Sequence, residues 1–77
     1  NKQMKLTEMR KSLLKQMHAY VIEIGDEELY MDWTALGVPD EPSEFDFDSI
    51  AEDDEAWVYI CKLFGKLVIA EKEENER

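Results

Sequence analysis

Apolar residues recur every three or four positions in two long stretches of this chain, which is the spacing of an amphipathic helix. The apolar positions of the N-terminal stretch share one helix face and are Leu6, Met9, Leu13, Met17, Tyr20 and Ile24. Thr7 is a candidate N-cap, and Gly25 can adopt the left-handed conformation that commonly ends a helix. The pattern predicts a helix over residues 6–24 with this stripe in the core.

The C-terminal stretch has the most continuous apolar stripe and predicts a helix over residues 54–71. Its members are Trp57, Ile60, Cys61, Phe64, Leu67 and Val68. Asp53 or Asp54 can cap this helix, and Glu55 places negative charge in its first turn, where the helix dipole favours it. Gly65 costs about 1 kcal/mol relative to alanine inside a helix. It indicates either close approach of another helix or a tolerated defect.

Two shorter helices are predicted between the long ones. Asp26 can cap a helix over residues 26–36, with Glu27 and Glu28 in its first turn. The apolar face of this helix is Leu29, Tyr30, Trp33 and Leu36. The competing interpretation is a β-hairpin at about residues 20–34, because apolar residues also alternate on both sides of Gly25 and Asp26.

A glycine and two prolines make residues 37–42 a stiff corner. Ser43 then caps a third helix over residues 44–52, with Asp46 where a capping box would prefer Glu or Gln. This helix buries Phe47, Ile50 and Ala51, and Phe45 lies nearer its rim. The expected fold is an all-α bundle of three to four helices in a single domain, residues 1–77, with a frayed tail at about 72–77. The hairpin alternative would make it α+β.

Charge is distributed unevenly along the 77 residues. Residues 16–61 contain no lysine or arginine but carry fourteen of the nineteen acidic residues, so this segment alone has a charge of −14. Residues 1–15 sum to +4 and residues 62–77 to zero, which together give the net charge of −10. Such a block repels nucleic-acid phosphate and anionic lipid, so we expect no direct nucleic-acid or membrane binding and a partner with a basic surface.

The residue types of a catalytic or metal site are scarce. Cys61 and His18 are the only soft metal ligands, too few for a structural zinc site. Cys61 is expected in a buried helix face, where a nucleophilic thiol is disfavoured. Asp46, Asp48 and Asp54 match three positions of an EF-hand loop, but the loop's glycine and bidentate glutamate are missing. We expect no enzyme activity, no cofactor and no metal, and the lone cysteine indicates a cytoplasmic protein.

The candidate binding surface combines the carboxylates of the acidic segment with two aromatic side chains among them. Its members are Asp26, Glu27, Glu28, Tyr30, Asp32, Asp40, Glu41, Glu44, Phe45, Asp46, Asp48, Glu52, Asp53, Asp54 and Glu55. An aromatic anchor ringed by charge is typical of a protein contact surface. Capping explains several of these carboxylates but not Asp40, Glu41, Glu44 and Asp48, so the prediction concentrates on the corner and the third helix.

Residues 25–69 resemble small acidic accessory proteins encoded by phages and prophages of Gram-positive bacteria. The residues that carry the resemblance are Gly37-Val38-Pro39-Asp40-Glu41-Pro42-Ser43, Phe47, Ile50-Ala51, Trp57 and Cys61-Lys62-Leu63-Phe64-Gly65. The resemblance implies a helical protein that binds a host or phage protein inside the bacterial cell. Inhibitors of bacterial defence, including anti-CRISPR proteins and DNA mimics, belong to this group.

Three hypotheses therefore stand at the level of sequence. The first is a non-enzymatic inhibitor that covers the nucleic-acid-binding surface of a host nuclease or effector. The second is a self-associating structural or regulatory protein, a homodimer in which the basic face of the first helix meets the acidic block of another copy. The third is a small enzyme or metal-dependent regulator that uses His18, Cys61 and the aspartates.

Overall fold

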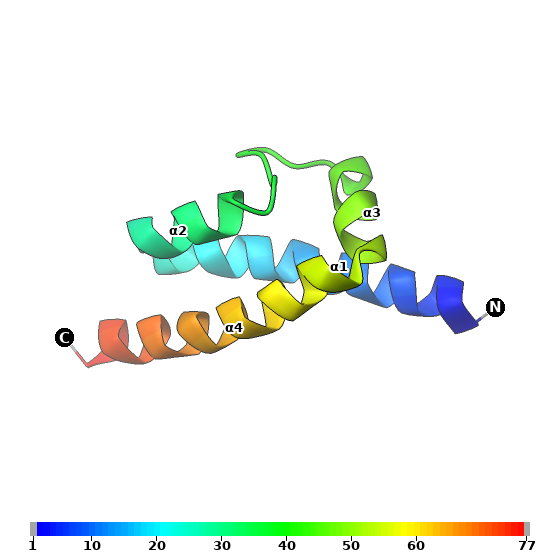
Figure 1. Ribbon diagram of the computed structural model, residues 1–77. Helices are drawn as coiled ribbons and strands as arrows, with labels where there is room; N and C mark the ends of the chain where they lie inside the picture. The colour runs from blue at the N-terminus through cyan, green and yellow to red at the C-terminus, as the bar shows by residue number, and fades with distance from the viewer. Residues whose placement is uncertain (1, 77) are drawn as a thin grey trace.

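The computed structural model describes residues 2–76, except for the side chains of residues 2–5 and Glu44, and shows four helices and no strand within that range (Figure 1). The helices are α1 (Lys2–Ile24), α2 (Glu27–Thr34), α3 (Glu44–Glu52) and α4 (Asp54–Asn75). The predicted all-α bundle is confirmed.

The hairpin alternative is wrong because the turn at Gly25 and Asp26 joins two helices. Gly25 has φ +71°, and its N–H donates to the Val21 carbonyl to close the last turn of α1. The Asp26 carboxylate accepts from the Leu29 N–H at 3.1 Å, which caps α2. Helical spacing then buries Leu29 and Trp33 on the same side of α2.

Helix boundaries differ from the predicted ones mainly at the chain ends. α1 begins at Lys2 rather than residue 6, so Thr7 is not its N-cap, and α4 continues to Asn75 through most of the segment expected to fray. Lysine, glutamate and glutamine are strong helix formers, so these ends remain helical without an apolar face. α2 is shorter than predicted because the chain turns after Thr34 and reaches φ +93° at Gly37.

α1 and α4 lie side by side and run in the same direction, with α2 returning along them and α3 crossing α1 (Figure 1). Two contacts between the long helices show this common direction, because Arg10 of α1 meets Asp54 of α4, and Tyr20, later in α1, meets Glu71, later in α4. The core lies between this pair and the two short helices, and its buried residues are Leu14, Met17, Val21, Leu29, Trp33, Val38, Phe47, Ile50, Ala51, Ile60, Leu63 and Leu67.

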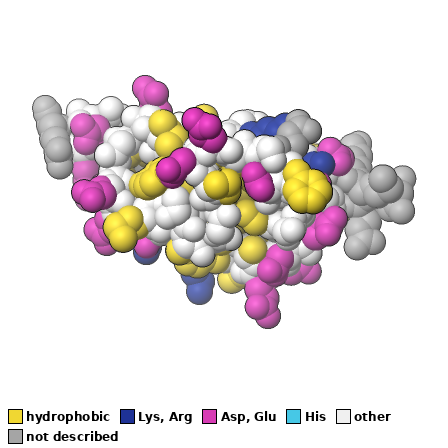
Figure 2. All heavy atoms as spheres, turned by 90° about the horizontal axis from the view of Figure 1, so that it is seen from above, with side chains coloured by type: hydrophobic (Ala, Val, Ile, Leu, Met, Phe, Trp, Pro, Cys, Tyr) yellow, Lys and Arg dark blue, Asp and Glu magenta, His cyan; other side chains and the backbone are white. Residues whose placement is uncertain are grey.

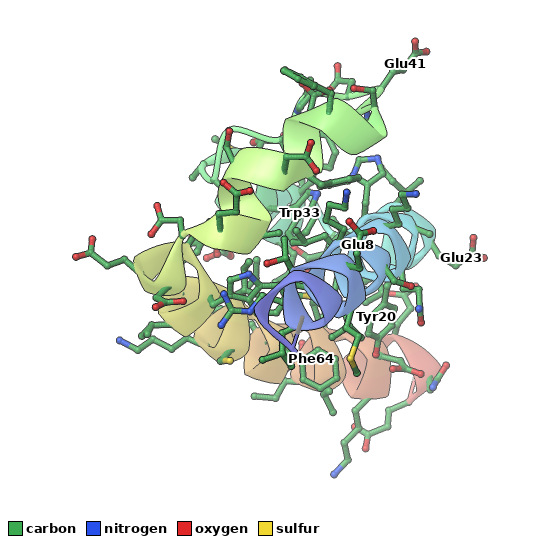
Figure 3. All side chains as sticks on the ribbon, turned by 90° about the vertical axis from the view of Figure 1, so that its right-hand side faces the viewer. Glu8, Tyr20, Glu23, Trp33, Glu41 and Phe64 are labelled. Carbon is green, nitrogen blue, oxygen red and sulfur yellow. The ribbon has the colours of Figure 1, made fainter. Side chains whose placement is uncertain are left out.

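Trp33 is the largest fully buried side chain and lies among the helices in Figure 3. Its indole N–H donates to His18 Nδ1 at 2.9 Å, so the polar edge of the ring is satisfied inside the core. His18 therefore has a structural role as the acceptor for this indole.

The predicted stripe of α1 is only partly in the core: Met17 is buried and Tyr20 and Ile24 pack against the core, but the first half of the stripe is exposed. Leu6, Met9 and Leu13 are 59%, 54% and 49% exposed, whereas Leu14 and Val21 are almost completely buried. α2 and α3 pack on only one side of the α1–α4 pair, so the core takes one edge of the apolar arc of α1 and leaves the other edge in solvent.

The α4 stripe is corrected in the same way. Ile60 and Leu67 are buried as predicted, and Leu63 joins them, but Phe64 and Val68 are 49% and 46% exposed. Cys61 is exposed, so the expected burial of its thiol is wrong. Both long helices thus carry more apolar surface than the small core can cover.

Candidate functional site

The predicted binding residues are spread over α2, the corner, α3 and the start of α4. Figure 2 views this side of the molecule from above and shows carboxylates scattered over the whole face, with few lysine or arginine side chains. They fall into two groups: residues whose side chains form helix caps, ion pairs or hydrogen bonds within the molecule, and residues whose side chains are exposed without such contacts to described residues.

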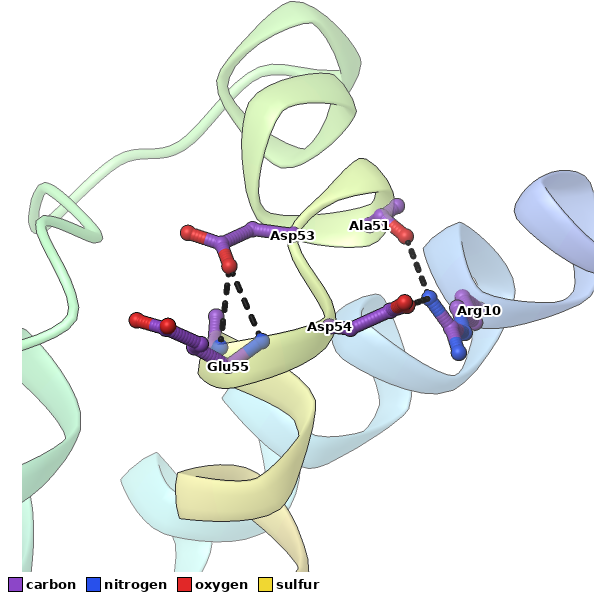
Figure 4. A network of polar contacts seen from close by, with 6 residues as sticks. Arg10, Ala51, Asp53, Asp54 and Glu55 are labelled. Carbon is purple, nitrogen blue, oxygen red and sulfur yellow. Dashed lines mark hydrogen bonds and ion pairs between the residues drawn. The ribbon is translucent and has the colours of Figure 1, made fainter.

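Three aspartates act as helix caps. Asp26 caps α2, as described above. Asp53 Oδ1 accepts from the N–H groups of Glu55 and Ala56 at 3.0 and 3.3 Å and caps α4 (Figure 4). The Asp46 carboxylate accepts from the backbone N–H of Ser43 at 2.8 Å, the half of a capping box that a longer Glu or Gln usually supplies. These three residues are explained by local structure.

Two more aspartates are paired with basic residues of α1. Arg10 Nη1 lies 3.0 Å from both Asp54 Oδ1 and the Ala51 carbonyl, so it ties α1 to the α3–α4 junction (Figure 4). Lys11 Nζ donates to Asp48 Oδ1 at 2.9 Å and to Glu8 Oε1 at 3.1 Å, and these two hydrogen bonds raise the pKa of Lys11 to about 12. Asp48, which helix capping does not explain, is therefore paired within the molecule by a lysine 37 residues away in the sequence.

Asp32 and Asp40 are also engaged inside the molecule. The Tyr30 hydroxyl donates to Asp40, which links α2 to the corner. The Asp32 side chain lies 3.4 Å from Lys66 Nζ, and its backbone carbonyl accepts from the Tyr59 hydroxyl at 2.9 Å. These contacts fasten α2 to α4 and to the corner.

The tyrosine–carboxylate pairs predict a loss of stability at alkaline pH. Donation to Glu71 raises the pKa of Tyr20, and donation to Asp40 raises the pKa of Tyr30, both from 10.0. A raised folded-state pKa contributes stability that is complete below the unfolded value of about 10 and is lost as pH rises through the folded value. Urea unfolding should therefore show a lower midpoint at a pH of about 11 than at about 8.

The matched control is the double variant Tyr20→Phe, Tyr30→Phe, which keeps both rings but removes both hydroxyls. Its urea midpoint should fall less over the same pH interval. Lys11 is present in both proteins, so its own titration cancels in the comparison. An equal fall in the two proteins would contradict a stabilising role for the two tyrosine hydroxyls.

Among the described residues, the other carboxylates of the predicted binding surface form no cap, hydrogen bond or ion pair of this kind. Glu27 and Glu28 line a shallow depression with Glu74 at the end of the molecule near the end of α4. Glu41, Glu52 and Glu55 are exposed on the side of the corner and α3. The side chain of Glu44 lies outside the described residues.

Phe45 is the most exposed large apolar residue on this side, with 80% of its surface in solvent. Phe47, two positions later, is the residue that α3 buries, at 2% exposure. Asp48 and Glu52 follow Phe45 at i+3 and i+7, so the ring and these two carboxylates share one stripe of α3. Phe45, Glu41, Asp48, Glu52 and Glu55 are hereafter called the α3 surface.

Sequence reasoning missed a second exposed surface between α1 and α4. An open apolar groove of about 290 Å³ lies there, lined by Leu13, Met17, Trp57, Ile60, Cys61 and Phe64. Arg10 lies over the Trp57 ring at 5.1 Å, and the buried Trp57 indole N–H has no hydrogen-bond partner among the described residues. The signal was present in the sequence, because the apolar arcs of both long helices are wider than a core stripe.

Among the described residues, no group of three or more His, Cys, Asp or Glu side chains converges in a way that could hold a metal ion. The same part of the chain contains no helix with the length and hydrophobicity to cross a membrane.

No family model, curated protein or solved structure matches this chain.

Proposed function

We propose that this protein is a non-enzymatic binding module whose α3 surface contacts a basic region of another protein. The observation that carries the proposal is the exposure of Phe45. Its neighbour Phe47 fills the core position of α3, so the fold makes no use of the second ring. Burial of a phenylalanine side chain in an interface is worth roughly 1.5–3 kcal/mol, which suits an anchor residue.

The carboxylates around Phe45 favour a partner of positive charge. Glu41 and Glu52 take part in no cap or ion pair between described residues, so both are available to a partner. Charges at the rim of an interface mainly speed encounter and exclude partners of the wrong sign. The proposed partner therefore has lysine or arginine around an apolar recess.

The finer proposal is that this basic region is the nucleic-acid-binding surface of a bacterial nuclease or effector. A groove built for phosphates is already lined with cations, and the chain would occupy it with carboxylates in place of phosphates. The exposed carboxylates of α3 and the corner support this idea. Competition is its test, because DNA or RNA should displace the chain from such a partner.

Self-association through the basic face of α1 is less well supported. That arrangement needs free cations on α1, but Arg10 and Lys11 already contact Asp54 and Asp48 of their own chain. Lys11 is also only 18% exposed. Breaking these pairs would cost the contacts that hold α3 and the start of α4 against α1.

Affinity capture from a bacterial lysate tests the proposal. The immobilised protein should retain a basic protein, and Phe45→Ala should weaken that binding by at least about tenfold, which is the loss of about 1.4 kcal/mol. The double variant Glu41→Lys, Glu52→Lys should weaken it most at low salt, because salt screens the charges that are lost.

Both variants avoid residues that support the fold. Reversal of Asp46 or Asp48, by contrast, would remove a helix cap or the Lys11 ion pair and confuse unfolding with lost binding. Met31→Ala is the control, since Met31 is 65% exposed on α2 outside the α3 surface. Equal capture by the wild type and the Phe45→Ala variant would sink the proposal.

A further inference from the structure

One stripe of α4 faces away from the core. Its members lie at intervals of four and three residues, the spacing of a helix–helix contact seam, and are Asp54, Val58, Cys61, Gly65, Val68 and Lys72. Val58 and Val68 are 59% and 46% exposed, and the other four are exposed as well. This set is called the outer stripe of α4.

The outer stripe is symmetric about Leu63. Consider an antiparallel pair of identical helices whose two-fold axis crosses α4 at the level of Leu63, on the exposed side of the helix. Each position before Leu63 in one helix then meets the position equally far after Leu63 in the other helix. Cys61 then meets Gly65 of the second helix, and Val58 meets Val68. Small residues face small ones at the centre, and apolar residues face apolar ones on either side.

The same register also pairs opposite charges at both ends. Asp54 lies nine positions before Leu63 and Lys72 nine positions after it, so each Asp54 meets the Lys72 of the second copy. The Asp54 side chain remains 88% exposed beside Arg10 and can accept a further hydrogen bond. A single alignment therefore pairs small residues at the centre of the stripe, apolar residues on either side of the centre and opposite charges at both ends.

We propose that α4 pairs antiparallel with α4 of a second copy of this chain, making the protein a symmetric dimer. This interface is separate from the α3 surface and does not depend on the proposed function. Glu41 of the corner and Phe64 of α4, which is next to Gly65 in the sequence but not part of the outer stripe, project from opposite sides of the molecule in Figure 3. The dimer would therefore leave the carboxylates around the corner in solvent, and the net charge of −10 per chain would not be concentrated at the interface.

The exposed area of one chain is consistent with a missing partner. A monomer of 9.1 kDa is expected to expose about 4,900 Å², whereas this chain exposes 5744 Å². The excess is about 800 Å², which is close to what each partner buries in a stable protein interface. The α1–α4 groove borders the outer stripe, because Cys61 belongs to both. The exposed apolar surface of the two long helices also includes the side chains of Leu6, Met9 and Leu13.

Gly65 has no role within one chain. A β-carbon at this position would meet nothing within 4 Å, so neither packing nor backbone conformation requires glycine there. At the centre of an antiparallel helix pair, by contrast, glycine opposite Cys61 allows the two backbones to approach closely.

The first test is the mass of the full chain in solution, measured by light scattering or sedimentation from about 1 µM to about 1 mM. We expect a dimer that persists or strengthens as salt rises, because its centre is apolar. A monomer throughout this range overturns the proposal. A dimer that dissociates at high salt also overturns it, because that result assigns the association to charge pairing.

Gly65→Glu tests the location of the interface. The open space around Gly65 leaves the folded monomer unaffected, so circular dichroism should be unchanged. Two carboxylates buried at the centre should weaken dimerisation by at least about a hundredfold. Met31→Glu, at an exposed position on α2, is the control and should have no effect. Equal dissociation constants for the wild type and Gly65→Glu would exclude this interface.

Cys61 provides an independent test because it is the only cysteine. In this register Cys61 is offset from the Cys61 of the second copy by four residues, about 6 Å along the helix axis. The axes of helices in contact lie about 8 Å apart and each Cα atom lies about 2.3 Å from its axis, so the two facing Cα atoms are about 7 Å apart. A short bismaleimide should therefore link two chains through Cys61. The double variant Cys61→Ser, Met31→Cys should remain unlinked. Linking only in the second protein would contradict the register.

Discussion

Trp33→Ala should lower the free energy of unfolding by about 3–5 kcal/mol. The variant leaves a cavity at the largest fully buried side chain and removes the donor to His18. A domain of 77 residues has a total stability of about 4–12 kcal/mol, so the loss is a large fraction of it. Urea unfolding followed by circular dichroism measures the change.

Met31→Ala is the control for Trp33→Ala because it truncates a large apolar side chain on the same helix, but one that is 65% exposed. Its effect should stay within about 0.5 kcal/mol. Similar losses in both variants would contradict the orientation of α2, in which Trp33 faces the core and Met31 faces solvent.

Leu14→Ala and Leu13→Ala should have very different effects although the residues are adjacent. Leu14 is fully buried, and its truncation should cost about 2–5 kcal/mol. Leu13 is 49% exposed in a single chain, so its truncation should cost under about 1 kcal/mol at concentrations where the protein is monomeric. The comparison tests the rotation of α1 about its axis.

Protein concentration distinguishes the contribution of Leu13 to the folded monomer from its contribution to an interface between two copies. If the long helices form an interface, Leu13→Ala should cost more stability at high protein concentration than at low concentration, because an oligomer is stabilised by mass action. The cost of Leu14→Ala should not depend on concentration. A larger loss for Leu13→Ala than for Leu14→Ala in the monomer would show that the predicted stripe, and not the observed one, faces the core.

The sequence predicted the helices of this fold well because their signals are local. Gly25 and Asp26 end one helix and cap the next through contacts within four residues, and Asp53 does the same for α4. Apolar spacing located every helix and the buried faces of α2 and α3, but not the rotation of the two long helices. Each long helix has an apolar arc wider than one interface, and only the packed neighbours decide which edge of the arc is buried.

The candidate surface was harder to predict because it depends on contacts distant in sequence. The acidic segment contains no lysine or arginine of its own, yet Arg10 and Lys11 reach its carboxylates from α1. These pairs remove Asp48 and Asp54 from the set of unpartnered charges. Phe45 was expected near the rim of α3, partly in contact with the core. It is instead 80% exposed, because Phe47 fills the core position of this helix.

Site-specific photo-crosslinking from position 45 tests the central claim most directly. The photoreactive residue p-benzoylphenylalanine in place of Phe45 preserves an exposed ring on the α3 surface, and the same residue in place of Met31 provides the control. After irradiation in a bacterial lysate, position 45 should give an adduct with a basic protein of another sequence, and added DNA or RNA should reduce its yield. No adduct from position 45, or an equal adduct from position 31, would contradict the α3 surface as the binding site.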